Sequence, residues 1–233
     1  MRDVNEALRI APNNTSLLSC RGEVYFQSGQ FDKSIADHSK AVALGATESS
    51  VFRSRGTARL YAGRLEEAAA DYVKASELAD KESRIYCDIW VAAIYGRLGK
   101  PVPDAIIKSA AAEAAGEWPR PALAVVTGAM PPAEMLKRID QKKGDERDMA
   151  LAEGYFYLGQ RYLVVGDKKT AQSYFEKARQ VGVFTYTEHM AAAFELQQLA
   201  KASPAAAAAP VAAKPVVTKP PPTPAGSAQP PPG

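Results

Sequence analysis

Small and apolar residues return along the chain at a spacing of 34 residues. Gly22 recurs as Gly56, and Ala7 recurs as Ala41 and Ala75. A period of this length is typical of a stack of helix pairs, in which a small residue lets the two helices of a pair approach closely. The pattern therefore predicts repeated pairs of antiparallel helices, with bulky residues filling the space between neighbouring pairs.

The clearest copy of the pattern lies in the C-terminal half of the chain. It follows the spacing W/Y-x2-L-G-x2-Y and then A-x3-F, which is the signature of the tetratricopeptide repeat. Its residues are Tyr155, Leu158, Gly159, Tyr162, Ala171 and Phe175. The expected fold class is thus an all-α solenoid of tetratricopeptide repeats with a C-terminal cap helix and a disordered tail rich in proline and alanine.

The same template divides the whole chain into units. Trp90 stands where the template expects a small residue, so we expect the helix packing to differ around it. Gly128 should end one short helix, and Pro131 should precede the next. The predicted units are the second half of a truncated repeat at 1–14, a repeat domain at 15–202 made of repeats at 15–48, 49–82 and 152–185, degenerate repeats at 83–116 and 117–151 and a cap helix at 185–202, and a disordered tail at 203–233.

The two ends of the chain differ from the repeats between them. Residues 1–14 match only the second helix of a repeat, whose apolar face would stay uncovered. Either a helix from elsewhere covers this face or, as we expect, the natural chain begins upstream, where any targeting signal would lie. Residues 203–233 contain no aromatic and no acidic residue. Such a segment cannot bury enough apolar surface to offset its ordering entropy, which predicts a polyproline-like tether.

Composition narrows the class of protein only moderately. The 233 residues are 46% apolar, which permits a packed core, and the formal charge is only +3. No cluster of Lys and Arg is dense enough to favour nucleic acid as a partner. No apolar run approaches the roughly 18 residues of a membrane-spanning helix. Cys20 and Cys87 lie two repeats apart, so we expect two buried, unbridged thiols rather than a disulfide.

A concave face is the natural binding surface of such an array. It should be lined by fixed positions of the first helix of each repeat. Phe26 and Tyr61 are the strongest candidates for partner anchors, because aromatic side chains concentrate binding energy at interfaces; packing between repeats is the alternative. The candidate partner-binding residues are Glu23, Phe26, Gln27, Arg53, Thr57, Leu60, Tyr61, Phe156 and Gln160.

Two pairs of opposite charge recur with the repeat. Arg21 and Arg55 occupy one template position, and Asp37 and Asp71 occupy another. The last repeat replaces both members together, by Leu158 and Tyr174. This joint replacement predicts that the two positions touch, so that each Arg and Asp forms an ion pair between the two helices of its repeat.

Candidate chemistry is sparse. His38 takes a position usually held by an aromatic packing residue, and neither it nor His189 has a second His or Cys one helical turn away. No glycine-rich phosphate loop or G-x-S-x-G motif occurs. We therefore expect no metal, no cofactor and no catalytic residues.

The segment from Arg84 to Leu199 resembles the C-terminal half of the NlpI-type bacterial outer-membrane lipoproteins. An unusual unit around Trp118 makes the resemblance specific, since ordinary repeat arrays lack it. The residues that carry it are Trp90, Glu117, Trp118, Pro119, Leu123, Gly128, Glu134, Met135, Leu136, the run from Ala152 to Gln160, Gly166, Asp167, Phe175, Gly182, Val183 and Glu188. The resemblance implies a scaffold of the cell envelope that forms homodimers and brings peptidoglycan hydrolases together with a processing protease.

The function expected from the sequence is thus a non-catalytic adaptor that holds protein or peptide partners in its groove. By resemblance, its setting is the periplasm or outer membrane. The alternative is a cytoplasmic tetratricopeptide module that assembles chaperone or regulatory complexes. A chaperone-type carboxylate clamp would need Lys and Asn at positions that here hold Ser19 and Glu23, then Arg53 and Thr57. That version of the alternative is disfavoured.

Overall fold

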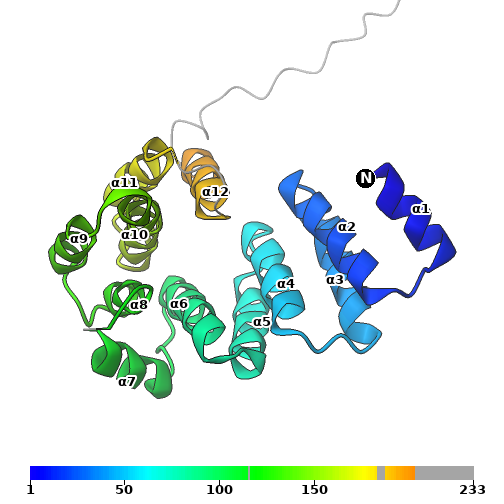
Figure 1. Cartoon of the computed structure of the whole chain (residues 1–233), viewed down its shortest axis with the longest axis horizontal. Coiled ribbons are helices and arrows are strands. Elements are labelled where there is room, and N and C mark those ends of the chain that lie inside the picture. Colours follow the sequence, from blue (N-terminus) through cyan, green and yellow to red (C-terminus); the bar gives the residue numbers. More distant parts are fainter. Residues whose placement is uncertain (115, 183–186, 203–233) are drawn as a thin grey trace, which may run out of the picture.

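The computed structural model describes residues 1–114, 116–182 and 187–202, and these residues form twelve α-helices and no β-strand (Figure 1). The tail predicted at 203–233 lies outside the described residues. The helices are α1 (Arg2–Ile10), α2 (Thr15–Gln27), α3 (Phe31–Ala43), α4 (Ser49–Tyr61), α5 (Leu65–Leu78), α6 (Lys81–Arg97), α7 (Asp104–Glu113), α8 (Arg120–Thr127), α9 (Pro132–Asp140), α10 (Gly144–Val164), α11 (Lys168–Gln180) and α12 (Thr187–Lys201).

The helices stack side by side along an arc. α2 packs on α3, α4 on α5 and α10 on α11, and each of the first two pairs continues onto the next helix in the chain. Figure 1 shows the arc running from α1 through α6 to α11, with α12 placed across its open side. The fold is therefore an all-α helical solenoid, as the sequence predicts.

Close approach within each regular pair depends on a glycine. A Cβ added to any of three glycines of α2, α4 and α10 would come within 3.0 Å of an aromatic ring or imidazole on the partner helix. The facing pairs are Gly22 with His38, Gly56 with Tyr72, and Gly159 with Phe175. The small residue at this template position thus has the role expected of it.

Both predicted ion pairs are confirmed. The guanidinium group of Arg21 donates two hydrogen bonds of 2.7 Å to the carboxylate of Asp37. Arg55 binds Asp71 in the same bidentate way, at 2.9 and 2.7 Å, and Arg59 adds a third bond of 2.7 Å to Asp71. These bonds join the two helices of each pair, so the recurring charges belong to the architecture.

The middle of the chain departs from this regular pairing. α6 carries Trp90 in place of the glycine, and it packs on α5, α8 and α10, while α7 packs on α8. The helix packing therefore differs around Trp90, as expected. Gly128 ends α8 with a φ of 89°, a left-handed conformation that glycine adopts without strain, and α9 begins at Pro132.

Two features of the helices differ from the sequence expectations. α10 begins at Gly144, so the boundary expected between residues 151 and 152 falls inside this helix. Cys87 is buried as expected, but the expectation was wrong for Cys20, which is exposed. Cys20 takes the repeat position of Ser54 and Tyr157.

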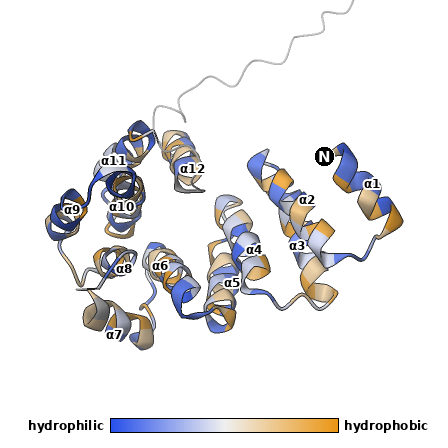
Figure 2. Cartoon of the chain, in the orientation of Figure 1, coloured by the Kyte–Doolittle hydropathy of each residue, from blue (hydrophilic) through white to orange (hydrophobic). Residues whose placement is uncertain are grey.

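In the described part of the chain, the apolar interior consists of one large cluster and two smaller ones. The large cluster extends from α2 to α12, one small cluster joins α8, α9 and α10, and the other lies around Leu8 and Leu18 at the N-terminal end. Every helix mixes hydrophobic and hydrophilic residues (Figure 2). Accordingly, none of the helices in the described segments is long and apolar enough to cross a membrane.

Candidate functional site

A cavity of about 410 Å³ opens on the inner face of the arc, lined by residues of α2, α4, α5, α6, α10 and α12. We call it the inner cavity. Its volume lies within the range of ordinary ligand sites, and aromatic side chains dominate its wall. The lining residues are Glu23, Phe26, Arg53, Ser54, Thr57, Tyr61, Tyr72, Tyr86, Trp90, Glu153, Phe156, Tyr157 and Ala191.

The indole of Trp90 is central to the wall. Its ring stacks on Tyr72 with centroids 5.7 Å apart and lies 5.7 Å from the ring of Phe156. A glycine at this position of a regular repeat lets the second helix close against the first. The indole is too large for that arrangement, so it lies on the inner face and joins the aromatic wall of the cavity.

Two exposed side chains of opposite charge also line the cavity. Glu23 comes from α2 and Arg53 from α4, and both remain accessible to water. Protein atoms surround much of the Glu23 carboxylate, and this partial desolvation raises its pKa, while the nearby charge of Arg53 lowers it in part. An aromatic cavity with a positive and a negative group beside it suits a peptide, whose apolar side chain and polar backbone need both.

A buried carboxylate connects the cavity to the unusual unit around Trp118. The indole N–H of Trp118 donates a hydrogen bond of 2.6 Å to an oxygen of Glu153, which is only 7% exposed. Glu153 lies on α10 and Trp118 lies just before α8. The bond fixes the orientation of a cavity-lining carboxylate from outside the regular repeats.

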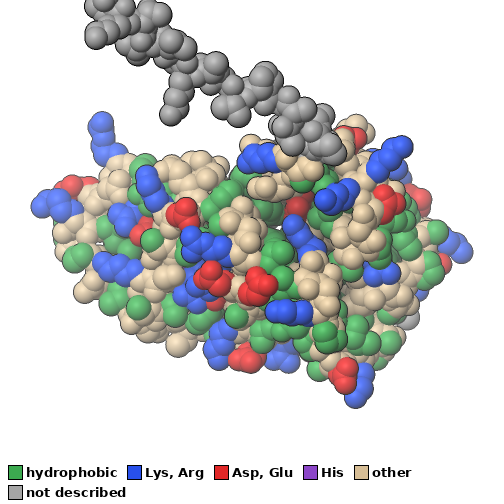
Figure 3. All heavy atoms as spheres, turned by 180° about the vertical axis from the view of Figure 1, so that it is seen from behind, with side chains coloured by type: hydrophobic (Ala, Val, Ile, Leu, Met, Phe, Trp, Pro, Cys, Tyr) green, Lys and Arg blue, Asp and Glu red, His purple; other side chains and the backbone are tan. Residues whose placement is uncertain are grey.

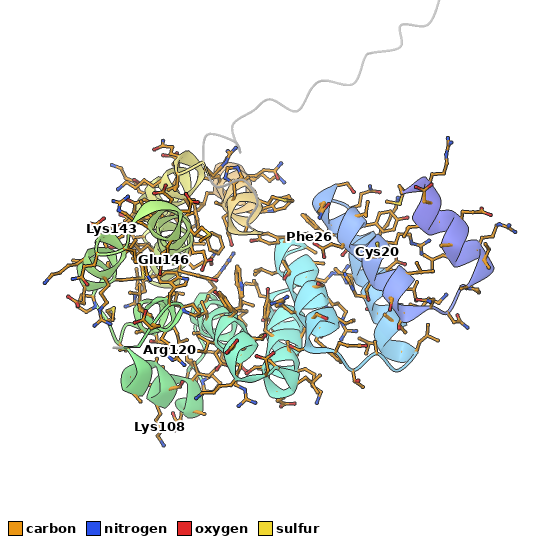
Figure 4. The ribbon with its side chains drawn as sticks, viewed as in Figure 1. Cys20, Phe26, Lys108, Arg120, Lys143 and Glu146 are labelled. Atoms are coloured by element: carbon orange, nitrogen blue, oxygen red, sulfur yellow. The ribbon has the colours of Figure 1, made fainter. Side chains whose placement is uncertain are left out.

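Helix α12 covers one side of the cavity by an aromatic contact. The ring of Phe194 lies 5.1 Å from Tyr61, 5.3 Å from Phe31 and 5.8 Å from Phe26, measured between centroids. Figure 4 places Phe26 in the space between α2 and α12. α12 therefore does more than cap the last repeat, since it also contacts the first two repeats across the inner face.

A polar contact holds α12 on the other side. Glu195 is 2% exposed, and its Oε1 accepts hydrogen bonds of 2.8 Å from Arg97 on α6 and 3.0 Å from Gln160 on α10. A buried carboxylate is stable only when charge and hydrogen bonds compensate its lost hydration. Arg97 and Gln160 provide both, so α12 is fixed in one position along the inner face.

The structure brings most of the sequence-predicted site residues together. The inner cavity is lined by Glu23, Phe26, Arg53, Thr57, Tyr61 and Phe156. Phe26, Tyr61 and Phe156 are nevertheless buried, at 7%, 5% and 0% exposure, so they are not free surface anchors while α12 is in place.

The other three predicted residues lie elsewhere. Leu60 is buried in the apolar interior, Gln160 binds Glu195, and Gln27 is exposed at the end of α2 outside the cavity wall. Sequence reasoning missed Trp90, Glu153 and the α12 residues Phe194 and Glu195 as parts of the site. The one available signal was Trp90 itself, which breaks the glycine pattern.

On the face seen in Figure 3, Lys and Arg side chains are interspersed with Asp and Glu, so this face carries no large patch of a single charge. Among the residues that the structure describes, no three His, Cys, Asp or Glu side chains are close enough to hold a metal ion.

Comparison with known proteins finds similar solved structures at low similarity. No family model matches the sequence, and no curated protein matches it. Two crystal structures of MamA are each 16% identical with a TM-score of 0.42, and they cover 77% of this chain and 79% and 85% of MamA. The structure of YrrB, a TPR protein with an unusual peptide-binding site, is 11% identical with a TM-score of 0.45 and covers 81% of this chain and 96% of YrrB.

Proposed function

We propose that this protein is a non-catalytic scaffold that binds protein or peptide segments on its inner face. The observation that carries the proposal is the inner cavity, which combines an aromatic wall with the exposed charges of Glu23 and Arg53. An apolar side chain of a partner would enter the cavity, where burial supplies affinity. The two charges would interact with polar groups of the partner and set its register more than its affinity.

The setting that we propose is the bacterial periplasm or outer membrane, where peptidoglycan hydrolases and a processing protease would be the partners. The support is the sequence resemblance to NlpI-type lipoproteins. The unit around Trp118, which makes the resemblance specific, contacts the cavity residue Glu153 in this chain. Fractionation of the native host tests this part separately. Recovery of the protein in the cytoplasmic fraction would contradict the envelope setting and leave the binding proposal intact.

The binding proposal is tested with peptides selected on the whole chain from a random phage-displayed library. Glu23→Ala and Arg53→Ala should each weaken the selected peptides about fivefold to thirtyfold, the range of an interface residue of moderate importance. Glu66→Ala and Arg179→Ala are matched controls, because they remove exposed charges of the same signs away from the cavity. Isothermal titration calorimetry measures the affinities, and circular dichroism confirms that helicity is retained.

Two results would reject this function. One is selection of no peptide whose affinity depends on Glu23 or Arg53. The other is an equal loss of affinity in the Glu66 and Arg179 controls, which would place binding outside the inner face.

A further inference from the structure

Helix α12 already occupies the inner face in the manner of a bound ligand. Three of its residues, Ala191, Phe194 and Glu195, are spaced so that they share one side of the helix, as at positions i, i+3 and i+4. Ala191 lines the inner cavity, Phe194 packs among three aromatic rings, and Glu195 is held by two hydrogen bonds. This spacing is the one that helices use when they dock into a groove.

The side chains of these three residues fill the spaces around them to different extents. The aromatic site accepts a full phenyl ring, with three neighbouring centroids between 5.1 and 5.8 Å away. At the polar site, Glu195 is only 2% exposed, and its carboxylate accepts hydrogen bonds from Arg97 and Gln160. At the third site a single methyl group faces a cavity of about 410 Å³. As a ligand for its own inner face, α12 leaves most of the inner cavity unfilled.

We propose that the partner of this face is an amphipathic helix with a large apolar residue three positions before a Phe and four before a Glu, and that it binds by displacing α12. This inference rests on the proposed function and names the chemistry of its partner. Such a helix keeps the contacts that Phe194 and Glu195 make now. It gains the burial of a large side chain in the inner cavity, which Ala191 cannot provide.

Displacement is favourable only if the partner helix gains more free energy by binding the inner face than the tethered α12 does. α12 is tethered to the chain, which gives it a high effective concentration, whereas a separate helix also loses conformational freedom on binding. Each additional methylene that enters an apolar site contributes about fourfold in affinity. A residue of the size of Leu at the Ala191 position should therefore raise the affinity of a competing helix by at least about tenfold.

The test uses synthetic peptides of residues 187–202 with the full chain. The peptide carrying Ala191→Leu should bind the wild-type chain at least about tenfold more tightly than the unmodified peptide, as measured by fluorescence anisotropy. Adding Phe194→Ala to that peptide should abolish the gain. Equal affinity of all three peptides would overturn the proposal.

The same substitution placed in the chain provides the decisive control. A chain with Ala191→Leu fills its own cavity and should bind the Ala191→Leu peptide about tenfold more weakly than the wild-type chain does. A chain with Phe194→Ala holds its own helix less firmly and should bind that peptide more tightly. This second variant keeps the test valid even if Ala191→Leu disturbs folding, and unchanged affinity for either folded variant rejects displacement.

Failure of this inference can be told from failure of the proposed function. Peptides selected by phage display that depend on Glu23 and Arg53, but do not compete with the α12 peptides, would keep the scaffold function and reject a helical partner. Loss of that dependence on Glu23 and Arg53 would reject the function itself.

Discussion

The helices of the two N-terminal pairs and those of the middle of the chain pack in different ways. α2 with α3 and α4 with α5 follow the 34-residue template, with a glycine at the closest approach and an Arg–Asp pair between the helices. In the segment from α6 to α9, Trp90 replaces the glycine, and α6 packs on α8 and α10. The regular part builds the frame and contributes Phe26, Tyr61 and Tyr72 to the inner cavity, and the departure from regularity adds Trp90 to its aromatic wall.

The largest expected effect lies in the regular part. Asp71 is 3% exposed and accepts bonds from two arginines. Asp71→Ala would leave Arg55 without its carboxylate partner and Arg59 with only Glu67, 3.2 Å away, and should lower the free energy of unfolding by about 3–5 kcal/mol. The double variant Arg55→Leu with Asp71→Tyr copies Leu158 and Tyr174 of the last repeat.

That double variant should recover at least half of the loss, measured by urea unfolding with circular dichroism. A double variant no more stable than Asp71→Ala would show that the apolar pair of the last repeat does not substitute for the ion pair.

A second effect in the regular part depends on pH. The pKa of His38 is lowered from 6.5 to about 4, chiefly because burial disfavours the charged imidazole; the charge of Arg55 also lowers it, whereas Asp37 and Asp71 oppose the shift. The unfolded chain takes up a proton below about pH 6.5, while folded His38 stays neutral to about pH 4. The folded state therefore loses stability as pH falls through this window, by roughly 3 kcal/mol in all.

His38→Phe, which copies Phe175 of the last repeat, should remove this contribution. The measurement compares urea midpoints of the two proteins from pH 7.5 to 4. Parallel curves for wild type and variant would show that His38 does not titrate in this way.

In the irregular part, Trp90→Ala should lower the free energy of unfolding less than the loss of Asp71 does, and its main effect should be on peptide binding. Trp90 is only half-buried, so loss of its contacts with Tyr72 and Phe156 should lower the free energy of unfolding by about 2 kcal/mol, less than for a fully buried indole. Peptides selected on the inner face should lose affinity at least tenfold. If their affinity is unchanged in a folded Trp90→Ala chain, the irregular unit does not build the site.

The smallest effect concerns an exposed ion pair between neighbouring repeats. Arg64 lies 2.7 Å from Asp32, and their side chains are 45% and 81% exposed. Exposed pairs of this kind contribute little, so Asp32→Ala should change the free energy of unfolding by less than about 0.5 kcal/mol. A loss above 1 kcal/mol would mean that contacts between repeats depend on surface charge more than the regular frame suggests.

Much of the frame could be predicted from sequence because each repeat can be compared with the other repeats of the same chain. The joint replacement of Arg and Asp by Leu158 and Tyr174 indicated a contact that the structure contains in two other repeats. The inward positions of α2 and α4 followed from the same template. Glu23, Arg53 and Thr57, which the template places on the inner face, line the inner cavity.

The rest of the candidate site had no such internal reference. Phe194 and Glu195 lie in a helix that occurs once, and their partners come from helices far away in the sequence. Periodicity says nothing about a contact between a unique helix and the opposite end of an array. Phe26 and Tyr61 were for this reason expected as anchors for a partner, whereas the structure places them against the chain's own α12.

The contact of Phe194 with the first repeats also changes how the array can unfold. In an open solenoid each unit touches only its neighbours, so the ends can fray while the middle stays folded. Here a ring from the last helix packs on α2, α3 and α4, and this closes a loop that spans almost the whole described chain. Opening of α2 or of α12 must break this contact, which links the local unfolding of these two parts of the array into one cooperative event.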